Sequence, residues 1–178
     1  MTKTSKIGRR GFMSASVASV AMASQTSVAH AAEDTDIYQY PITRSDDEWR
    51  ARLEDIEFFV LRKGGTEGPR TSSLWNNTAT GTYCCKGCDL TVYRSLHKIE
   101  LDKGWVFFRH AEKDTVLTDL DLGEGAMGDP FAEMQAAMEV HCRRCGSHLG
   151  HIVALPDVPN RPIHCINGFA LSFQPGTA

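Results

Sequence analysis

Residues 140–173, VHCRRCGSHLGHIVALPDVPNRPIHCINGFALSF, contain most of the side chains with chemical function in this chain. In order they are Cys142, Cys145, His148, His151, Cys165 and Asn167. A second CxxC pair, Cys85 and Cys88, lies upstream in the segment GTYCCKGCDL. The two CxxC pairs predict a metal site, and the remaining residues predict a separate nucleophile site.

Two CxxC pairs supply four thiolates, which is a common ligand set of structural zinc sites. A tight turn at each pair brings both sulfurs to one point, and Gly87 and Gly146 lie near these turns. A zinc ion bound there would clip distant strands together. The predicted ligands are Cys85, Cys88, Cys142 and Cys145. A single CxxC pair would instead be typical of a redox disulfide. Cys84 does not fit the CxxC spacing and is left over.

Cys165 is the candidate nucleophile. His148 and His151 would hold substrate or water and transfer protons. Asn167 lies two residues after Cys165, so on a strand both side chains point to the same face of the sheet. A single buried cysteine is more often an inert core residue, and its spacing alone leaves that alternative open.

The first 31 residues predict an export signal. They contain four basic residues and no acidic one, with paired arginines at Arg9-Arg10 and Phe12 two residues later. A short Ala/Ser/Val run follows, and small residues at Ala29 and Ala31 resemble a cleavage site. The paired arginines indicate the twin-arginine route. The apolar run is too short and too rich in serine for a membrane anchor, and an amphipathic or disordered N-terminus is the alternative.

Removal of this segment would leave an acidic protein. The whole chain has 19 Lys and Arg against 22 Asp and Glu. The mature part would have 15 basic and 22 acidic residues, a net charge near −7. Such a charge disfavours nucleic acid and anionic membranes as partners. Export usually favours disulfides, but zinc loaded before twin-arginine export would protect its thiolates.

Helices are predicted near the start of the mature part and strands after it. Ser45 and Glu48 form a capping box for a helix that runs to about Arg62 and stops at Gly64-Gly65. Its apolar face would consist of Trp49, Leu53, Ile56 and Val60. Short β-prone segments follow at 82–84, 90–95, 105–109, 115–118, 139–141, 150–154 and 163–173. A second short helix is predicted at 130–138.

Three segments resemble the methionine-R-sulfoxide reductase B family, and the match runs from about Glu48 to Gln174. GTEGPRTSSLWNNTATGTYCCKGC resembles the family's GTE-P-F-T-x-x-Y-W-D-N…G-x-Y-x-C-x-x-C. HCRRCGSHLGHI resembles its R-C-x-x-C-x-x-H-L-G-H-V, and HCINGFALSF resembles its Y-C-I-N-S-x-S-L-x-F. The spacing from His151 to Cys165 is also close to that of the family.

The resemblance implies a mainly β fold with two antiparallel sheets, of the Mss4-like or β-tent type. Short N-terminal helices and a four-cysteine zinc site remote from the active site would accompany the sheets. The resemblance also implies a reaction, in which Cys165 attacks the sulfoxide sulfur as a thiolate of lowered pKa. Methionine would leave, and Cys165 would become a sulfenic acid.

Five further roles follow from the same resemblance. His148, His151 and Asn167 match family positions that bind and protonate the sulfoxide oxygen. Trp75 and Trp105 match tryptophans that cage the methyl–sulfur group, a suitable contact for a polarizable sulfur. Core packing is the alternative for either tryptophan, and it is compatible with lining the pocket.

The chain departs from the family at positions that concern substrate contacts and regeneration. The family's GCGWPSF reads DKGWVFF here, so Lys103 replaces the usual resolving cysteine. Ala137 occupies a position where the family tends to have arginine, and Ile163-His164 replaces an Arg-aromatic pair beside the nucleophile. The segment LPDVP lacks the family's Asp-Gly-Pro.

The sequence therefore predicts a twin-arginine signal peptide at 1–31, a linker at 32–44 and a reductase-like domain at 45–178. The predicted protein is a periplasmic or secreted monomer that acts on oxidised methionine, in proteins or free. It would take electrons from a thioredoxin-like or other thiol reductant, and have no nucleic-acid partner and no membrane partner after signal cleavage. A non-catalytic ligand-binding module on the same zinc-stabilised β scaffold is the alternative. A purely structural zinc ribbon would not explain the second set of residues.

Overall fold

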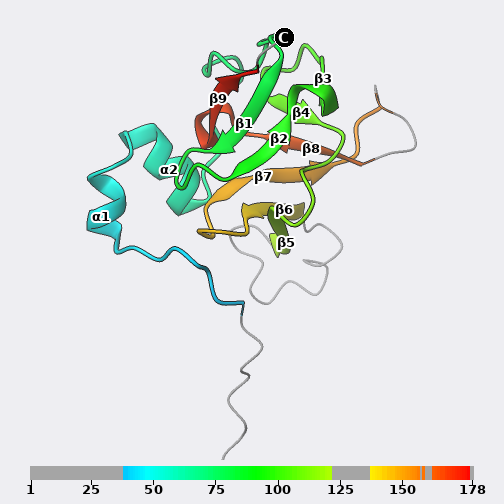
Figure 1. Ribbon diagram of the computed structural model, residues 1–178. Helices are drawn as coiled ribbons and strands as arrows, with labels where there is room; N and C mark the ends of the chain where they lie inside the picture. The colour runs from blue at the N-terminus through cyan, green and yellow to red at the C-terminus, as the bar shows by residue number, and fades with distance from the viewer. Residues whose placement is uncertain (1–37, 122–136, 157, 159–161, 177–178) are drawn as a thin grey trace, which may run out of the picture. The chain divides into compact units, whose positions relative to one another are not determined.

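The described chain contains antiparallel strands in two sheets, preceded by two short helices (Figure 1). The computed structural model describes residues 38–121, 137–156, 158 and 162–176. The predicted signal peptide and residues 32–37 of the predicted linker lie outside these ranges. The helices are α1 (Asp46–Arg50) and α2 (Asp55–Lys63), and two 3-10 turns are η1 (Ser95–His97) and η2 (Gly168–Ala170). The strands are β1 (Gly81–Cys85), β2 (Thr91–Arg94), β3 (Lys98–Ile99), β4 (Val106–Phe108), β5 (Val116–Asp121), β6 (Ala137–Cys142), β7 (His148–Val153), β8 (Ile163–Ile166) and β9 (Leu171–Pro175).

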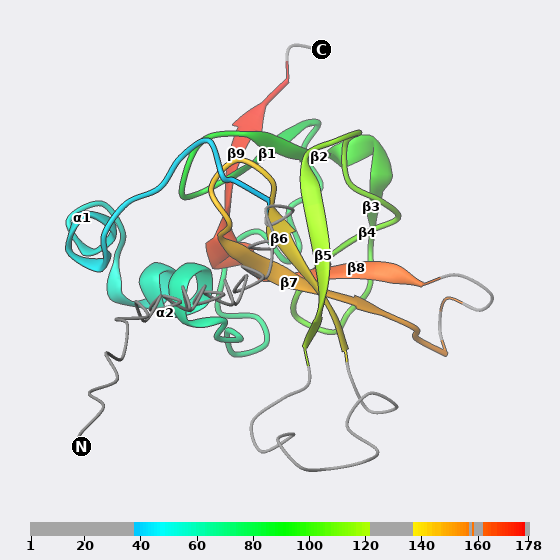
Figure 2. The ribbon, with the colours of Figure 1, turned by 90° about the horizontal axis from the view of Figure 1, so that it is seen from below.

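The two sheets have the orders β2-β1-β9 and β3-β4-β8-β7-β6-β5, and their strands pair antiparallel throughout. This confirms the predicted mainly β fold with two antiparallel sheets. Figure 2 shows α1 and α2 on one side of the strands, and α2 contacts β7 and η2.

Aromatic side chains from both sheets pack together in the core. Tyr93 of β2 stacks on Phe108 of β4, with ring centroids 4.2 Å apart and planes inclined by 12°. Tyr83 of β1 meets the same phenylalanine edge-on at 5.1 Å. All three rings are fully buried. Aromatic contacts of this kind contribute roughly 0.5–1.5 kcal/mol each beyond the burial of their area, and here they join one sheet to the other.

The register of the larger sheet brings the candidate site residues into one row. Glu139 of β6 lies opposite His151 of β7, which lies opposite Cys165 of β8. Cys165 in turn lies opposite Phe107 of β4. Directly opposed residues point to the same face of a sheet, so the pairing places a thiol beside an imidazole at the centre of the sheet.

The predicted capping box is confirmed, but the single helix is not. The Glu48 N–H donates to Ser45 Oγ (3.3 Å) and the Ser45 N–H donates to the Glu48 carboxylate (2.8 Å). The helix predicted to run to Arg62 is interrupted, because Glu54 adopts an extended backbone and starts a second capping box. The sequence pattern missed this break because the apolar spacing continues across it.

The end of α2 agrees with the sequence. Gly64 has a left-handed backbone with a φ of 67°, which costs little without a Cβ. The helix therefore stops at the predicted glycine.

Two other element predictions need correction. The strand predicted over 163–173 is divided by η2, which turns the chain from β8 in one sheet to β9 in the other. The helix predicted at 130–138 lies mostly outside the described residues, and its last two residues, Ala137 and Met138, begin strand β6 instead. The two-residue strand β3 was not predicted.

Residues 38–44, within the predicted linker, pack on the second CxxC loop. The Ile42 N–H donates to the Arg144 carbonyl oxygen (2.9 Å), and the Tyr40 ring lies against Gly146. Across the ranges that the structure describes, no helix is long and apolar enough to cross a membrane.

Candidate active site and metal site

The cysteines of the two CxxC pairs converge on one point. Their four sulfur atoms all lie within 4.8 Å of one another. Cys85 Sγ lies 3.7 Å from Cys145 Sγ, and Cys88 Sγ lies 3.5 Å from Cys142 Sγ. A tetrahedral site with Zn–S bonds of about 2.3 Å requires sulfurs about 3.8 Å apart, whereas a disulfide requires about 2.05 Å. The cluster therefore has the geometry of a metal site.

Tight turns bring each pair of sulfurs together, as predicted. The Cys88 N–H donates to the Cys85 carbonyl oxygen (3.2 Å), and the Gly146 N–H donates to the Cys142 carbonyl oxygen (2.8 Å). Gly146 has a φ of 66°. Because Cys85 ends β1 and Cys142 ends β6, the cluster joins the smaller sheet to the larger one.

The thiols of this cluster depend strongly on one another's protonation. Hydrogen bonds from neighbouring thiols lower the pKa of Cys88 and Cys145, and hydrogen bonds within the same cluster raise the pKa of Cys85 and Cys142. Four thiolates could not stand together there without a compensating cation. The donor set thus fits a divalent metal such as zinc. Cys84 is buried outside the cluster, with its sulfur 3.5 Å from Thr91 Oγ1.

A separate cavity of about 130 Å³ contains the candidate nucleophile. Its lining consists of Thr66, Trp105, Gly150, His151, Cys165 and Asn167. Gly150 permits a close approach of β7 to β8, because a Cβ there would lie 2.2 Å from the Cys165 carbonyl oxygen. Four of the predicted site residues are therefore brought together: Cys165, His151, Asn167 and Trp105.

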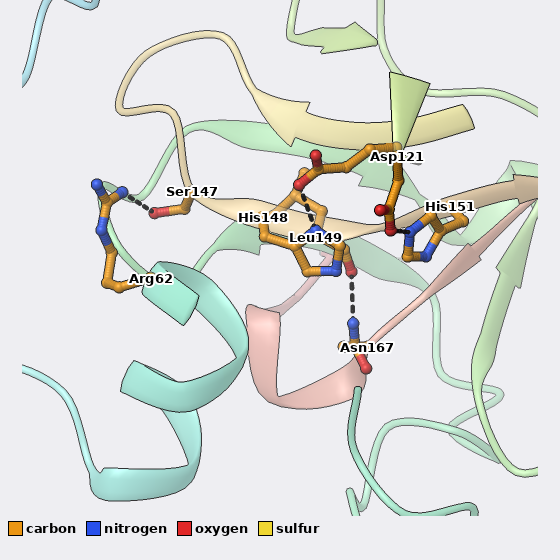
Figure 3. A network of polar contacts seen from close by, with 8 residues as sticks. Arg62, Asp121, Ser147, His148, Leu149, His151 and Asn167 are labelled. Atoms are coloured by element: carbon orange, nitrogen blue, oxygen red, sulfur yellow. Dashed lines mark hydrogen bonds and ion pairs between the residues drawn. The ribbon is translucent and has the colours of Figure 1, made fainter. Parts of the chain in front are cut away.

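Each histidine is held by an acidic residue from another strand of the larger sheet (Figure 3). His151 Nε2 donates to Asp121 Oδ2 (2.9 Å), and His148 Nδ1 donates to the carboxylate of Glu139. The two imidazole rings lie 5.2 Å apart. His148 is 4% exposed and lines a different cavity from Cys165. No residue in the described ranges forms a hydrogen bond with its Nε2. The structure thus places His151 at the thiol and His148 behind it.

The carboxamide of Asn167 is fixed by two backbone groups. Its Nδ2 donates to the Leu149 carbonyl oxygen (3.2 Å), as Figure 3 shows. Its Oδ1 accepts from the Glu67 N–H (3.0 Å). An amide nitrogen has two hydrogens, so one donor remains on Asn167 for a ligand.

The two predicted tryptophans lie in different cavities. Trp105 lines the thiol cavity, and its Nε1 donates to the Glu67 carbonyl oxygen (3.2 Å). Trp75 lines a larger cavity together with Glu100 and Asp102. Trp105 thus lies at the thiol and Trp75 does not, and a substrate contact by either tryptophan stays a prediction.

The surroundings of the Cys165 thiol disfavour its ionisation. Burial and, after it, the negative charge of Glu67 raise the pKa of Cys165 to about 11. The prediction of a lowered pKa is therefore wrong. The sequence could not show that the thiol would be buried or that the charge of a carboxylate distant along the chain would act on it.

Alkylation of Cys165 by iodoacetamide should consequently depend steeply on pH. The rate follows the thiolate fraction, which rises about tenfold per pH unit below the pKa. We expect this rise to continue through pH 10 and to level off near the raised pKa of about 11. An unperturbed cysteine levels off near pH 8.5. Mass spectrometry of the Cys165 peptide measures the rate, and a plateau near pH 8.5 would contradict the raised pKa.

Three acidic residues of the site were not predicted. Asp121 and Glu139 hold the histidines, and Glu67 holds Asn167. Glu139 lies on β6, beside the histidine-bearing strand β7, whereas Asp121 lies on β5, two strands away. Glu67 lies 100 residues from Asn167 in the chain, and only its place in the segment GTE sets it apart from other glutamates.

A thiol, an imidazole, a carboxamide and an indole share one cavity, and the sheets that carry them are joined by a four-cysteine site. These features define a small thiol oxidoreductase with a separate metal site. The SelR domain matches residues 53–175. The chain belongs to the SelR-domain family, which includes the peptide methionine sulfoxide reductases MsrB.

Several relatives with that name match most of the chain. A peptide methionine sulfoxide reductase MsrB of Leifsonia xyli is 36% identical over 143 residues, which cover 77% of this chain and 94% of the relative. One of Agrobacterium fabrum is 31% identical over 142 residues, 79% of this chain and 98% of the relative. One of Leptospira interrogans is 33% identical over 135 residues, 76% of this chain and 97% of the relative.

Proposed function

We propose that this protein reduces the R epimer of methionine sulfoxide to methionine, in peptides or as the free amino acid, through the thiol of Cys165. The main support is that Cys165 shares one cavity with His151, Asn167 and Trp105. Membership in a family whose relatives are named peptide methionine sulfoxide reductases supports the same reaction.

The reaction transfers one oxygen atom and two electrons. Cys165 Sγ attacks the sulfoxide sulfur, and the sulfoxide oxygen passes to the cysteine sulfur as the S–O bond to methionine breaks. One thiol and one sulfoxide give one sulfenic acid and one thioether, so no other reactant is consumed. The cysteine sulfur is oxidised by two electrons, and the sulfoxide sulfur is reduced by two electrons to give methionine.

His151 and Asn167 would stabilise the oxygen during this transfer. The imidazole of His151 donates a proton toward the sulfoxide oxygen and recovers one from the thiol. The remaining N–H of Asn167 donates a hydrogen bond to the same oxygen. The Trp105 ring, held by its bond to Glu67, offers an aromatic surface to the S-methyl group.

The four-cysteine site would hold a structural zinc ion. The fit rests on the sulfur–sulfur distances of 3.5 and 3.7 Å and on the burial of three of the four cysteines. A bound zinc ion supplies folding energy and leaves no ligand position open for chemistry. No step of the proposed reaction uses it.

Turnover of each methionine sulfoxide epimer with dithiothreitol tests the proposal directly. The R epimer should be reduced and the S epimer left unchanged. A wild-type protein inert on both epimers would favour the alternative, a non-catalytic binding module. The raised pKa of Cys165 is the observation that favours that alternative.

Regeneration should require an external thiol. Lys103 replaces the usual resolving cysteine, and Cys84 is buried in β1 of the smaller sheet while Cys165 lies in β8 of the larger one. After one turnover without reductant, we expect Cys165 as a sulfenic acid that dimedone traps, or as a mixed disulfide with an added thiol. Mass spectrometry of the oxidised protein identifies these species.

Cys84→Ser is the matched control for this cycle. It should change neither the rate with dithiothreitol nor the dimedone adduct. A peptide pair that links Cys84 to Cys165 in the oxidised protein would make Cys84 the resolving thiol and contradict the single-cysteine cycle.

The biological setting also forms part of the proposal. The paired arginines and the small residues at Ala29 and Ala31 support export to the periplasm or beyond. There a monomer would act on oxidised methionine with a thioredoxin-like or other thiol reductant. Cell fractionation with and without a functional twin-arginine system tests this part, since Arg9→Lys with Arg10→Lys should retain the protein in the cytoplasm.

A further inference from the structure

Glu67, in the loop between α2 and β1, is a buried carboxylate with an unusual set of contacts. Its side chain is bound to the turn that follows the candidate nucleophile. Oε1 accepts from the Gly168 N–H and Oε2 accepts from the Phe169 N–H, both at 2.8 Å. The residue is only 2% exposed.

The backbone of Glu67 contacts two residues of the thiol cavity. Its N–H donates to Asn167 Oδ1 (3.0 Å), and its carbonyl oxygen accepts from Trp105 Nε1 (3.2 Å). One residue therefore binds the carboxamide, the indole and the turn after Cys165. A displacement of Glu67 would therefore disturb the contacts of Asn167 and Trp105 together.

Burial of the Glu67 carboxylate is expected to destabilise the folded protein. Within the described residues, the partners of the Glu67 carboxylate are backbone N–H groups, and no cation pairs with it. Burial raises the pKa of Glu67, and the hydrogen bonds from Phe169 and Gly168 act in the opposite direction. A buried charge without an ion pair usually costs stability, and such groups concentrate at functional sites.

We propose that Glu67 is a positioning residue of the reduction site: its carboxylate anchors the Gly168–Phe169 turn, and through this anchor its backbone holds Asn167 and Trp105 against the substrate. The inference rests on the proposed reductase activity. Glu67 itself does not line the thiol cavity and is not a catalytic residue.

The charge of Glu67 provides a readout that a purely structural role would not give. The titratable groups near Cys165 are His151 on β7, with Asp121 bound to it, Glu67, and His164 next to it on β8. Among them, Glu67 is the one whose charge raises the pKa of Cys165. Loss of this charge should shift the pH midpoint of Cys165 alkylation downward.

Two substitutions separate charge from position. Glu67→Gln removes the charge and turns one acceptor into a donor against a backbone N–H. Glu67→Asp keeps the charge but withdraws the carboxylate by one methylene. We expect kcat/KM for N-acetyl methionine-R-sulfoxide to fall roughly 10- to 100-fold in both variants, the loss that misplaced site groups typically cause. The alkylation midpoint should fall in Glu67→Gln and stay near the wild-type value in Glu67→Asp.

Glu57→Gln is the matched control. Glu57 is also a buried carboxylate, 6% exposed, but it pairs with Lys86 and the Glu54 N–H. Its loss should reduce thermal stability without moving the alkylation midpoint or the kcat/KM of the folded fraction. This variant shows what destabilisation alone does.

Other outcomes decide against the inference. If the wild type reduces the R epimer and both Glu67 variants retain its kcat/KM, the inference fails while the proposed function stands. A second outcome is that the activity of both Glu67 variants falls only in proportion to their folded fraction, and that the alkylation midpoint falls equally in both. Glu67 would then be structural, and the inference would also fail. An inert wild type instead rejects the proposed function. If Glu67→Gln does not fold, Glu67→Asp is compared in the wild type and in an Asn167→Ala background. The loss of kcat/KM that Glu67→Asp causes should nearly vanish in that background, and an equal loss in both backgrounds would contradict the inference.

Discussion

Cys165→Ser is expected to abolish reduction of methionine-R-sulfoxide and to leave the fold and the metal content unchanged. The hydroxyl is a far weaker nucleophile than a thiolate, and oxygen cannot form the sulfenic acid on which turnover depends. Serine is close to cysteine in volume, and Cys165 is not one of the four clustered cysteines. We expect kcat/KM to fall by at least ~10³-fold, as when an enzyme loses its nucleophile.

Cys84→Ser is the control for this experiment, because Cys84 is a buried cysteine that belongs to neither site. Chromatographic measurement of methionine formed from each epimer gives the rates. Residual turnover in Cys165→Ser above one hundredth of the wild-type rate would show that another group attacks the sulfoxide.

The raised pKa of Cys165 limits how the attack can begin. At pH 7 a thiol with a pKa of about 11 is thiolate in roughly one molecule in ten thousand. Ionisation of Cys165 should therefore occur within the enzyme–substrate complex, where the sulfoxide oxygen can accept the thiol proton. His151 lines the same cavity and its Nε2 is held by Asp121, so it is placed to relay that proton.

The predictions that the structure confirms rest mainly on local sequence patterns. The Ser45–Glu48 capping box and the Gly64 stop depend on residues within a few positions of one another. The CxxC spacing brought each pair of thiols to one turn. Cys165 and Asn167 do line one cavity, but β8 ends at Ile166 and Asn167 caps η2, so the predicted strand alternation is not the reason. Such patterns are readable because neighbours in sequence are neighbours in space.

Most features that the sequence did not reveal depend on contacts between distant segments, but one is local. The break between α1 and α2 arises where Glu54 begins a second capping box, although the apolar spacing runs through it. The contact between Glu67 and η2 spans 101 residues, and the contact between Asp121 and His151 spans 30. Burial and, after it, the charge of Glu67 raise the pKa of Cys165. Both depend on the fold, so the direction of this shift could not be predicted from the sequence.

Removal of the proposed zinc ion is expected to unfold the protein. The four sulfurs join β1 of the smaller sheet to the end of β6 in the larger one. Binding of a structural zinc ion is worth about 10–16 kcal/mol in small zinc domains, whereas a whole domain is stable by only about 5–15 kcal/mol. Loss of one ligand should therefore remove both the metal and the cooperative thermal transition.

Cys142→Ser tests this expectation, with Cys84→Ser as the matched control that should keep one zinc per chain. Zinc released on heating is measured with a colorimetric chelator, and near-ultraviolet circular dichroism reports the packing of the buried aromatic rings. Because Cys84 neighbours Cys85, the double variant Cys84→Ser, Cys85→Ser excludes a substitute ligand. Full metal content and a native spectrum in that double variant would contradict the ligand assignment, since three thiolates would then suffice to hold the sheets together.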